Sequence, residues 1–192
     1  MSVVSKVIQF IFIILLIVMF GIILAFLPID IVDNVELQSN AESINETDLN
    51  KLTYKKLNDE RSKRDLNRLE KREDIEEIAI YKTDRMISEN YISHTAPDGE
   101  EVRDRFELFD VECKLVGENL AKTFYNTKVD TGYEGTVTYQ SMEELSTGIT
   151  KQFMNSPSHK DNILDERWES HGISVQVTSD NEVYATHKFC QV

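Results

Sequence analysis

The stretch NSPSHKDNIL, residues 155–164, lies where one helix pattern must end and another can begin. A residue that precedes proline is disfavoured in the helical region, so the helix predicted over Met142–Met154 has to stop by Ser156-Pro157. Proline suits the first position of a helix, and Ser156 can cap a short helix that carries His159. The stretch therefore predicts two consecutive helices with a histidine near the start of the second.

The segments on either side complete the fold prediction. Leu52–Asn90 has apolar residues at helical spacing and contains neither glycine nor proline. Ile173–Val177 alternates in polarity, a turn follows, and Val183–Phe189 is extended again, which predicts a β-hairpin. A further strand can form near Val111–Leu120. Helices first and strands last favour an α+β domain in which helices pack on an antiparallel sheet.

The N-terminus has a different composition. Residues 7–27 carry no charge and would, as a helix, cross the roughly 30 Å core of a bilayer. A cleaved signal peptide has a shorter apolar region and a small-residue cleavage site, which Phe26-Leu27-Pro28-Ile29 does not offer. Lys6 precedes the apolar run and acidic residues follow it. We therefore predict a single-pass anchor in the cell membrane, with residues 1–6 cytoplasmic and the C-terminal domain extracellular.

Composition divides the remainder of the chain. Residues 28–51 are polar and acidic and are expected to form an extracellular linker, and residues 52–192 have the size of one folded domain. Asn45-Glu46-Thr47 is a glycosylation sequon in that linker. The formal net charge of −13 argues against nucleic acid as a partner, because phosphates would be repelled. It equally disfavours docking on anionic headgroups, so the membrane is contacted through the anchor.

The chain has two cysteines, Cys113 and Cys190. An even pair in a domain expected to face an oxidising compartment predicts a disulfide. Closing so long a loop stabilises a protein by roughly 4–5 kcal/mol in the chain-entropy model. Two buried, reduced thiols are the alternative.

Four histidines are candidates for chemistry. His171 starts a predicted strand and His187 lies within one, where structural roles are expected. His94, in SHTAPDG (residues 93–99), and His159 stand among small polar residues and prolines. Such loops and helix starts are where a scaffold displays reactive groups.

A third segment, VGENLA (residues 116–121), places Glu118 after a glycine that allows close backbone approach. Together, SHTAPDG, VGENLA and NSPSHKDNIL resemble the CAP superfamily of cysteine-rich secretory, antigen 5 and pathogenesis-related proteins, particularly its bacterial and archaeal branch with SCP-like domains. The resemblance covers about Lys56–Cys190, and further matching positions are Asn58, Arg61, Met86, Trp168 and Gly172. It implies an α-β-α sandwich outside the cell, with a cleft where two histidines meet acidic residues.

The resemblance also implies a set of site residues. The expected cleft is formed by His94, Thr95, Glu118, Asn119, Ser156 and His159. Two neutral imidazoles, those of His94 and His159, can bind zinc or another divalent cation, and a nearby carboxylate fixes a ring. Two ligands are fewer than the three of a typical catalytic zinc site, so we expect modest affinity.

Two functions fit these residues. The first is a non-enzymatic extracellular module that binds a lipid, peptide or cell-envelope ligand. The alternative is a metal-assisted hydrolase of the peptidase kind, with a polarised carbonyl or an activated water. No nucleophile turn surrounds Ser93 or Ser158, and Glu143 and Glu144 lie at the wrong end of their helix to supply the family's second cleft glutamate. We therefore favour binding; any enzyme would be a hydrolase.

Overall fold

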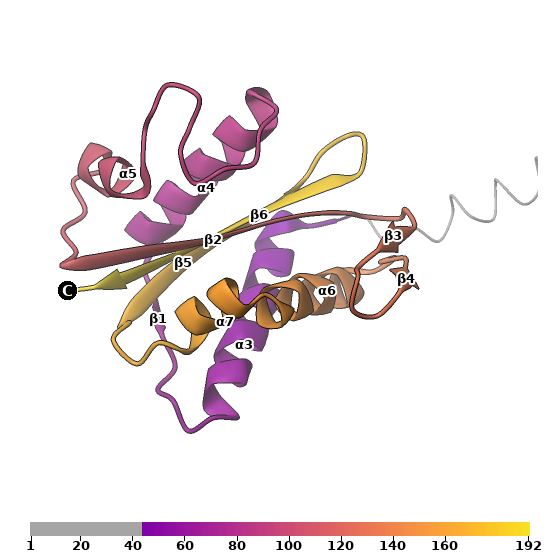
Figure 1. The fold of residues 1–192 in the computed structure, drawn as a ribbon, viewed down its shortest axis with the longest axis horizontal. Coiled ribbons are helices and arrows are strands. Elements are labelled where there is room, and N and C mark those ends of the chain that lie inside the picture. The colour runs from indigo at the N-terminus through magenta and orange to yellow at the C-terminus, as the bar shows by residue number, and fades with distance from the viewer. Residues whose placement is uncertain (1–43) are drawn as a thin grey trace, which may run out of the picture. The chain divides into compact units, whose positions relative to one another are not determined.

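The computed structural model describes residues 44–192, which form five helices and six strands (Figure 1). In chain order these are α3 (Glu46–Ser62), β1 (Glu70–Lys71), α4 (Glu73–Ser88), α5 (Val102–Leu108), β2 (Leu115–Phe124), β3 (Val129–Asp130), β4 (Thr136–Val137), α6 (Met142–Asn155), α7 (Pro157–Leu164), β5 (Ser170–Val177) and β6 (Glu182–Gln191). The predicted α+β class is confirmed.

Four strands form one mixed sheet in the order β1-β5-β6-β2, and β3 pairs with β4 separately. β1 is parallel to β5, while the other pairs are antiparallel. β5 and β6 are the predicted β-hairpin. β2 is an edge strand that pairs Glu118 with Lys188 and Asn119 with His187 of β6. Because side chains alternate along a strand, Glu118 and Asn119 face opposite sides of the sheet.

Helices cover both faces of the sheet (Figure 1). α4 and α5 lie over one face, where Ile75 and Ile78 pack with Phe106. α3, α6 and α7 lie over the other, around a larger core that includes Leu57 and Phe153. Most of β6 is therefore buried, polar residues included. A polar side chain in such a strand needs a partner, since unpaired burial is costly.

Gly172 shows how closely a helix approaches the sheet. A Cβ atom at this position would lie 2.3 Å from the backbone nitrogen of Glu76 in α4. Any larger residue at position 172 would collide with α4 and force the helix away from β5, because packed interiors have no spare room. The absence of a side chain at Gly172 thus sets the spacing between α4 and β5.

The domain begins before residue 52. α3 starts at Glu46, inside the segment 28–51 expected to be a linker, and Leu49 is fully buried. Asn45 is the N-cap, and its Oδ1 accepts a hydrogen bond from the backbone nitrogen of Asp48 at 3.2 Å. Asparagine is a favoured N-cap residue, so Asn45 marks a helix start within a run whose polar composition suggests a linker.

The predicted anchor, residues 7–27, lies outside the described residues. Among the helices of residues 44–192, none combines the length and the apolar character that a bilayer crossing requires. The anchor therefore stays a prediction from the sequence.

The middle of the chain differs most from expectation. The strand placed near Val111–Leu120 is β2, which begins only at Leu115. The short helix α5 precedes it and was not predicted. Its buried residues are Arg105 and Phe106, so a charged side chain occupies a core position and obscures the apolar periodicity.

The junction of α6 and α7 follows the prediction in its backbone. α6 ends at Asn155, Pro157 opens α7, and Ser156 is the N-cap residue. The Ser156 side chain makes no capping hydrogen bond, contrary to expectation; its Oγ lies 3.4 Å from Oγ of Ser158. Proline at the first helical position already presets the backbone angle, so the helix starts without that bond.

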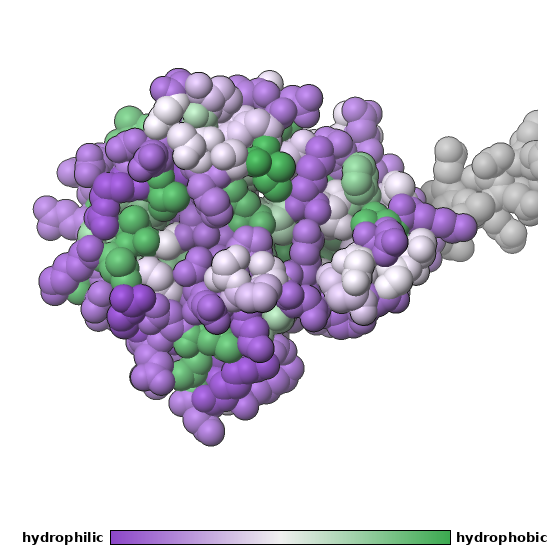
Figure 2. Space-filling model, viewed as in Figure 1, coloured by the Kyte–Doolittle hydropathy of each residue, from purple (hydrophilic) through white to green (hydrophobic). Residues whose placement is uncertain are grey.

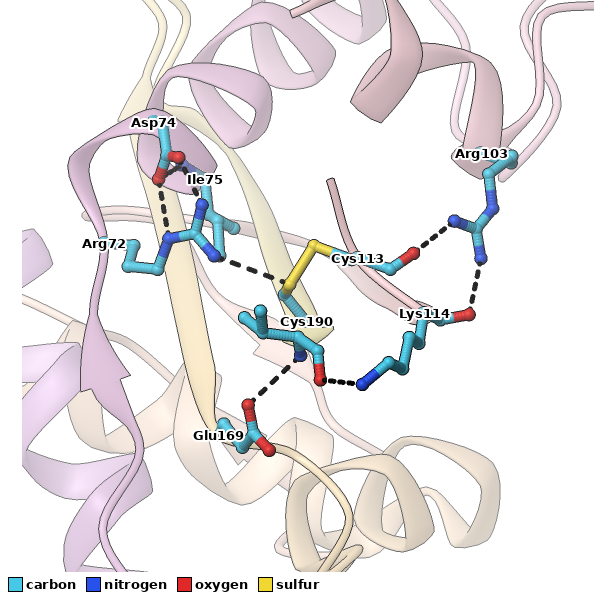
Figure 3. The surroundings of a disulfide bond; sticks show 9 residues. Arg72, Asp74, Ile75, Arg103, Cys113, Lys114, Glu169 and Cys190 are labelled. Carbon is cyan, nitrogen blue, oxygen red and sulfur yellow. Dashed lines mark hydrogen bonds and ion pairs between the residues drawn. A yellow bond between two sulfur atoms is a disulfide. The ribbon is translucent and has the colours of Figure 1, made fainter. Parts of the chain in front are cut away.

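Cys113 and Cys190 form a disulfide, as predicted (Figure 3). Their Cα atoms are 5.6 Å apart, and the bridge spans 77 positions of sequence. Cys190 is in β6 opposite Val116, so the bridge closes one end of the β2–β6 pair. That end lies two residues from the Glu118–Lys188 pair.

The face of the domain in Figure 2 is mostly hydrophilic, with apolar residues in small separate groups. Large apolar side chains that are exposed include Ile80, Ile92 and Leu108. Small separate apolar groups such as those in Figure 2 are usual on protein surfaces and do not indicate an apolar interaction site on this face.

Candidate histidine–glutamate site

His94 lies in the connection between α4 and α5. The Asp98-Gly99 turn predicted to end its segment is present: Gly99 has φ +93° and donates its N–H to the carbonyl of Ala96 at 2.9 Å. Glycine tolerates this left-handed backbone without steric cost. The Oδ1 of Asp98 accepts from the backbone nitrogen of Glu100 at 3.1 Å. These local bonds shape the loop behind His94.

Two buried cationic side chains bind the backbone of the loop that carries His94. Lys82 of α4 donates to the carbonyl of Ser93 at 2.7 Å, and Arg105 of α5 donates to the carbonyl of His94 at 2.8 Å. Lys82 and Arg105 are both fully buried, with 0% relative exposure. The backbone on either side of the His94 α-carbon is therefore fixed by charged donors, which make stronger hydrogen bonds than neutral ones.

Glu118 of β2 fixes the ring of His94. Nδ1 of His94 lies 2.8 Å from Oε1 of Glu118. Nη2 of Arg105 lies 3.1 Å from Oε2 of the same carboxylate, and the ammonium of Lys188 bonds to that oxygen as well. Glu118 is only 5% exposed, whereas the His94 side chain is 54% exposed. The buried carboxylate thus binds three side chains and forms the hub of the site, and His94 is the one of the three that is exposed to solvent.

The charges of this hub are strongly coupled. Burial alone would raise the pKa of Glu118, but the hydrogen bond from His94 and the charges of Lys188 and Arg105 outweigh it and lower that pKa to about 2. Burial lowers the pKa of Lys188 to about 8, although Glu118 opposes this change. Burial and the charge of Arg105 lower the pKa of Lys82 to about 8. At neutral pH Glu118 is therefore ionised and directly paired to two cations.

His159 approaches β2 from the opposite face of the sheet. Its backbone carbonyl accepts from Nδ2 of Asn119 at 2.8 Å, and Oδ1 of Asn119 accepts from Asn162 at 2.8 Å. The His159 ring meets Phe153 edge-on at 5.5 Å. Nδ1 is buried and lacks a hydrogen-bond partner among the described residues. Burial, and secondly the charge of His94, lower the pKa of His159, which favours its neutral form.

The edge strand β2 joins the two halves of the site. Glu118 holds the ring of His94 on one face, and its neighbour Asn119 holds the backbone of His159 on the other. Two consecutive residues thus bring together segments that are sixty-five positions apart. The structure bonds His94 to Glu118; within residues 44–192, no hydrogen bond links His159 to either of them.

The other expected cleft residues have different surroundings. Asn119 positions His159, as described above. Thr95 is exposed, and Ser156 lies beside Ser158. In the described part of the chain, neither the Thr95 nor the Ser156 hydroxyl is bonded to a site histidine.

Side-chain amides occupy the free edge of β2 next to the site. Nδ2 of Asn162 in α7 lies 3.4 Å from the carbonyl of Glu118. Nε2 of Gln152 in α6 donates to the carbonyl of Lys122 at 3.2 Å. Two backbone acceptors that point away from β6 are therefore already bonded to helices of the same domain.

His171 and His187 form a buried pair, in keeping with the structural roles expected for them. The amide of Asn58 is oriented by two bonds to the backbone of Leu69, so its Nδ2 must donate to Nε2 of His171 at 3.3 Å. His171 then donates through Nδ1 to Nε2 of His187 at 2.9 Å. Burial lowers the pKa of His171 to about 3 and that of His187 well below its ordinary value. Both rings are neutral and serve the core.

The donor set limits what metal the site can take. No group of three or more histidine, cysteine, aspartate or glutamate side chains in residues 44–192 is arranged to hold a metal ion. Glu118 is engaged by Arg105 and Lys188, so it acts behind His94 rather than as a ligand. The donors that remain are Nε2 of His94 and a ring nitrogen of His159. Whether a cation uses both rings is a question for experiment, taken up below.

A mixed sheet with helices on both faces, and a loop histidine bonded to a buried glutamate on the edge strand, agree with what the resemblance to the CAP superfamily implies. The sequence matches the family CAP, described as the cysteine-rich secretory protein family, over residues 54–191. The chain belongs to this family.

Solved structures of similar fold come from bacteria. An outer surface protein of Borrelia burgdorferi has a TM-score of 0.62 and 22% identity, over 79% of this chain and 98% of that one. An extracellular protein with an SCP domain from Bacillus anthracis has a TM-score of 0.57 and 23% identity, over 77% of this chain and 41% of that one. A cysteine-rich secretory protein of Staphylococcus aureus has a TM-score of 0.55 and 18% identity, over 79% and 40%. The chain thus spans about two-fifths of the last two proteins. A comparison with curated proteins gives no match.

Proposed function

We propose that this CAP domain is held outside the cell by the N-terminal anchor and binds an extracellular ligand at His94, which Glu118 orients, and at His159. The observation that carries the proposal is the fixed orientation of His94. Its Nδ1 is engaged by a buried, ionised carboxylate, while half of the side chain remains accessible. A structural histidine would bury its ring, as His171 and His187 do.

The tautomer of His94 defines the chemistry of the ligand. Glu118 is ionised and can only accept at Oε1, so neutral His94 donates through Nδ1. Nε2 then carries the lone pair and is the ring nitrogen left to act as an acceptor or metal ligand. A ligand with hydroxyl or amide donors suits this nitrogen, which includes peptides, envelope carbohydrates and lipid headgroups.

A divalent cation such as zinc is the second proposed occupant, held by His94 and His159. We expect modest affinity, because only two protein ligands are offered and three cations, Lys82, Arg105 and Lys188, lie beneath the loop. Neutral imidazoles are required for binding, so affinity should fall at acidic pH, where protons compete with the cation for the ring nitrogens.

Zinc calorimetry at pH 7 tests the cation. Wild type should bind, and His94→Ala and His159→Ala should each lose the binding isotherm while staying folded. Asp161→Ala, an exposed acidic position on the same helix as His159, is the matched control and should bind like wild type. Equal binding by all four proteins would place zinc elsewhere.

The organic ligand is tested by mass spectrometry of small molecules retained by the purified protein. A molecule present in wild type and lost in His94→Ala supports the proposal. Identical extracts from the two proteins would contradict it.

The location is tested separately. Protease added to intact cells should remove the domain and leave a short anchor; a protected domain would refute the external location. Asn45 is exposed, and its Oδ1 caps α3 while Nδ2, the atom that would carry a glycan, makes no described bond. In a host with N-glycosylation, a mass shift abolished by Asn45→Asp would establish modification there.

The metal-assisted hydrolase remains the weaker alternative, and we do not propose it. Glu118 is ionised and engaged by Arg105 and Lys188, so it is a poor general base. A nucleophilic hydroxyl bonded to either site histidine is missing from residues 44–192.

A further inference from the structure

The two sulfurs of the disulfide differ in their surroundings (Figure 3). Cys190 is fully buried in β6. Cys113 is partly exposed and lines a pocket of about 590 Å³ with Phe106, Val111 and Lys114. Of the two cysteines, Cys113 is therefore the one that borders a space open to a small molecule.

The backbone of Cys113 is held in that position. Arg103 of α5 donates to the carbonyl of Cys113 at 2.7 Å and to that of Lys114 at 3.2 Å. Figure 3 shows Arg103 on the far side of the bridge from Arg72. The partly exposed cysteine is thus fixed to the helix that borders the pocket.

A cation lies beside the buried sulfur. Nη1 of Arg72 is 3.7 Å from Sγ of Cys190. The other donors of this guanidinium bind the carboxylate of Asp74, which holds the side chain in place. A neighbouring guanidinium stabilises a thiolate, and a stabilised thiolate leaves faster in thiol–disulfide exchange.

We propose that the Cys113–Cys190 bridge is a site of thiol–disulfide exchange, at which a small external thiol attacks Cys113 and releases Cys190. The incoming thiolate forms a new S–S bond to Cys113, and the original bond breaks. Its electron pair leaves on Cys190 as a thiolate beside Arg72. Disulfide number and oxidation state are conserved, since one mixed disulfide and one thiolate replace one disulfide and one thiolate. This inference is independent of the ligand proposed for the histidine–glutamate site.

Mapping of the first adduct tests the direction of attack. The full-length native protein is exposed to 2-mercaptoethanol, quenched in acid, alkylated with N-ethylmaleimide and analysed by peptide mass spectrometry. We expect the mercaptoethanol adduct on Cys113 and the maleimide on Cys190, in at least about tenfold excess over the reverse, because access decides which sulfur is attacked. In urea both sulfurs should react alike, which is the control. Comparable adducts in the native protein, a preference for Cys190, or no exchange before unfolding would each overturn the proposal.

Two variants separate the role of Arg72 from a loss of structure. Arg72→Gln removes the cation at the leaving sulfur and should slow exchange about threefold, the effect of roughly one pKa unit on a leaving thiol. Asp74→Asn breaks the same ion pair but keeps the guanidinium, so exchange should be as fast as in wild type or faster. If Arg72 were merely structural, both variants would loosen the region and both would accelerate exchange.

Discussion

Replacing Glu118 by glutamine should destabilise the domain by about 3–5 kcal/mol, the usual cost of removing one partner of a buried ion pair. The lowered pKa of this carboxylate leads to a figure of similar size. Its surroundings lower the pKa of Glu118 from 4.5 to about 2, which corresponds to roughly 3 kcal/mol at pH 7. The variant leaves Lys188 buried with no carboxylate bonded to its ammonium.

Urea unfolding followed by fluorescence measures this loss. The single tryptophan of the chain, Trp168, is buried and stacked on Phe189, so its emission reports the folded core. Urea is preferable to guanidinium because it does not screen charges. A second substitution provides the control. Lys188→Met in the Glu118→Gln background removes the unpaired buried ammonium and should restore about 2 kcal/mol of the free energy of unfolding.

The pH dependence of the free energy of unfolding tests the same interaction. Because the folded pKa of Glu118 is depressed, the unfolded chain binds the extra proton between pH 4.5 and about 2. This contribution to stability is complete above pH 4.5 and is lost as pH falls toward 2. The variant should lack that component. A Glu118→Gln protein within about 1 kcal/mol of wild type, or a double variant no more stable than the single, would refute the coupling described for this hub.

Three further outcomes are expected. His171 and His187 should show neutral imidazole signals in NMR titrations down to the onset of acid unfolding, because burial depresses both pKa values. The free energy of unfolding should therefore fall as pH drops below 6.5, where the unfolded chain takes up these protons. Protonation of either ring in the folded state at pH 6 would contradict this. Gly172→Ala should cost about 1–3 kcal/mol in thermal unfolding by overpacking α4 against β5, and an unchanged midpoint would show that the helix can shift freely. Removing the disulfide by Cys113→Ala with Cys190→Ala should cost roughly 4–5 kcal/mol in urea unfolding, with a loss under about 1 kcal/mol contradicting the chain-entropy argument.

The residues of the candidate site could be singled out where their local sequence is unusual. His94 and His159 stand beside prolines and small residues, and Glu118 follows a glycine, so each marks a loop or strand position that packing alone does not require. The C-terminal hairpin was predictable from strict alternation, and the end of α6 from Pro157. These features depend on short-range backbone preferences, which sequence expresses directly.

The residues that hold the site together were missed. Lys82 and Arg105 belong to helices rich in charge, where a lysine or arginine is usually solvated, and only the fold shows that these two point inward. Lys188 offered a signal: it stands between buried positions in a strand covered on both sides, where a cation requires a partner. That the partner is Glu118 depends on the β2–β6 register, which links residues seventy positions apart.

The amides on the free edge of β2 decide how a neighbour can approach the domain. An exposed strand edge invites pairing with another chain, and such pairing requires unoccupied backbone carbonyls. Asn162 and Gln152 already occupy those of Glu118 and Lys122. An extended peptide or a second copy of the domain therefore cannot add to the sheet beside His94 without displacing them. Recognition at this edge therefore depends on side chains, and copies of the domain that meet there do not join into a continuous sheet.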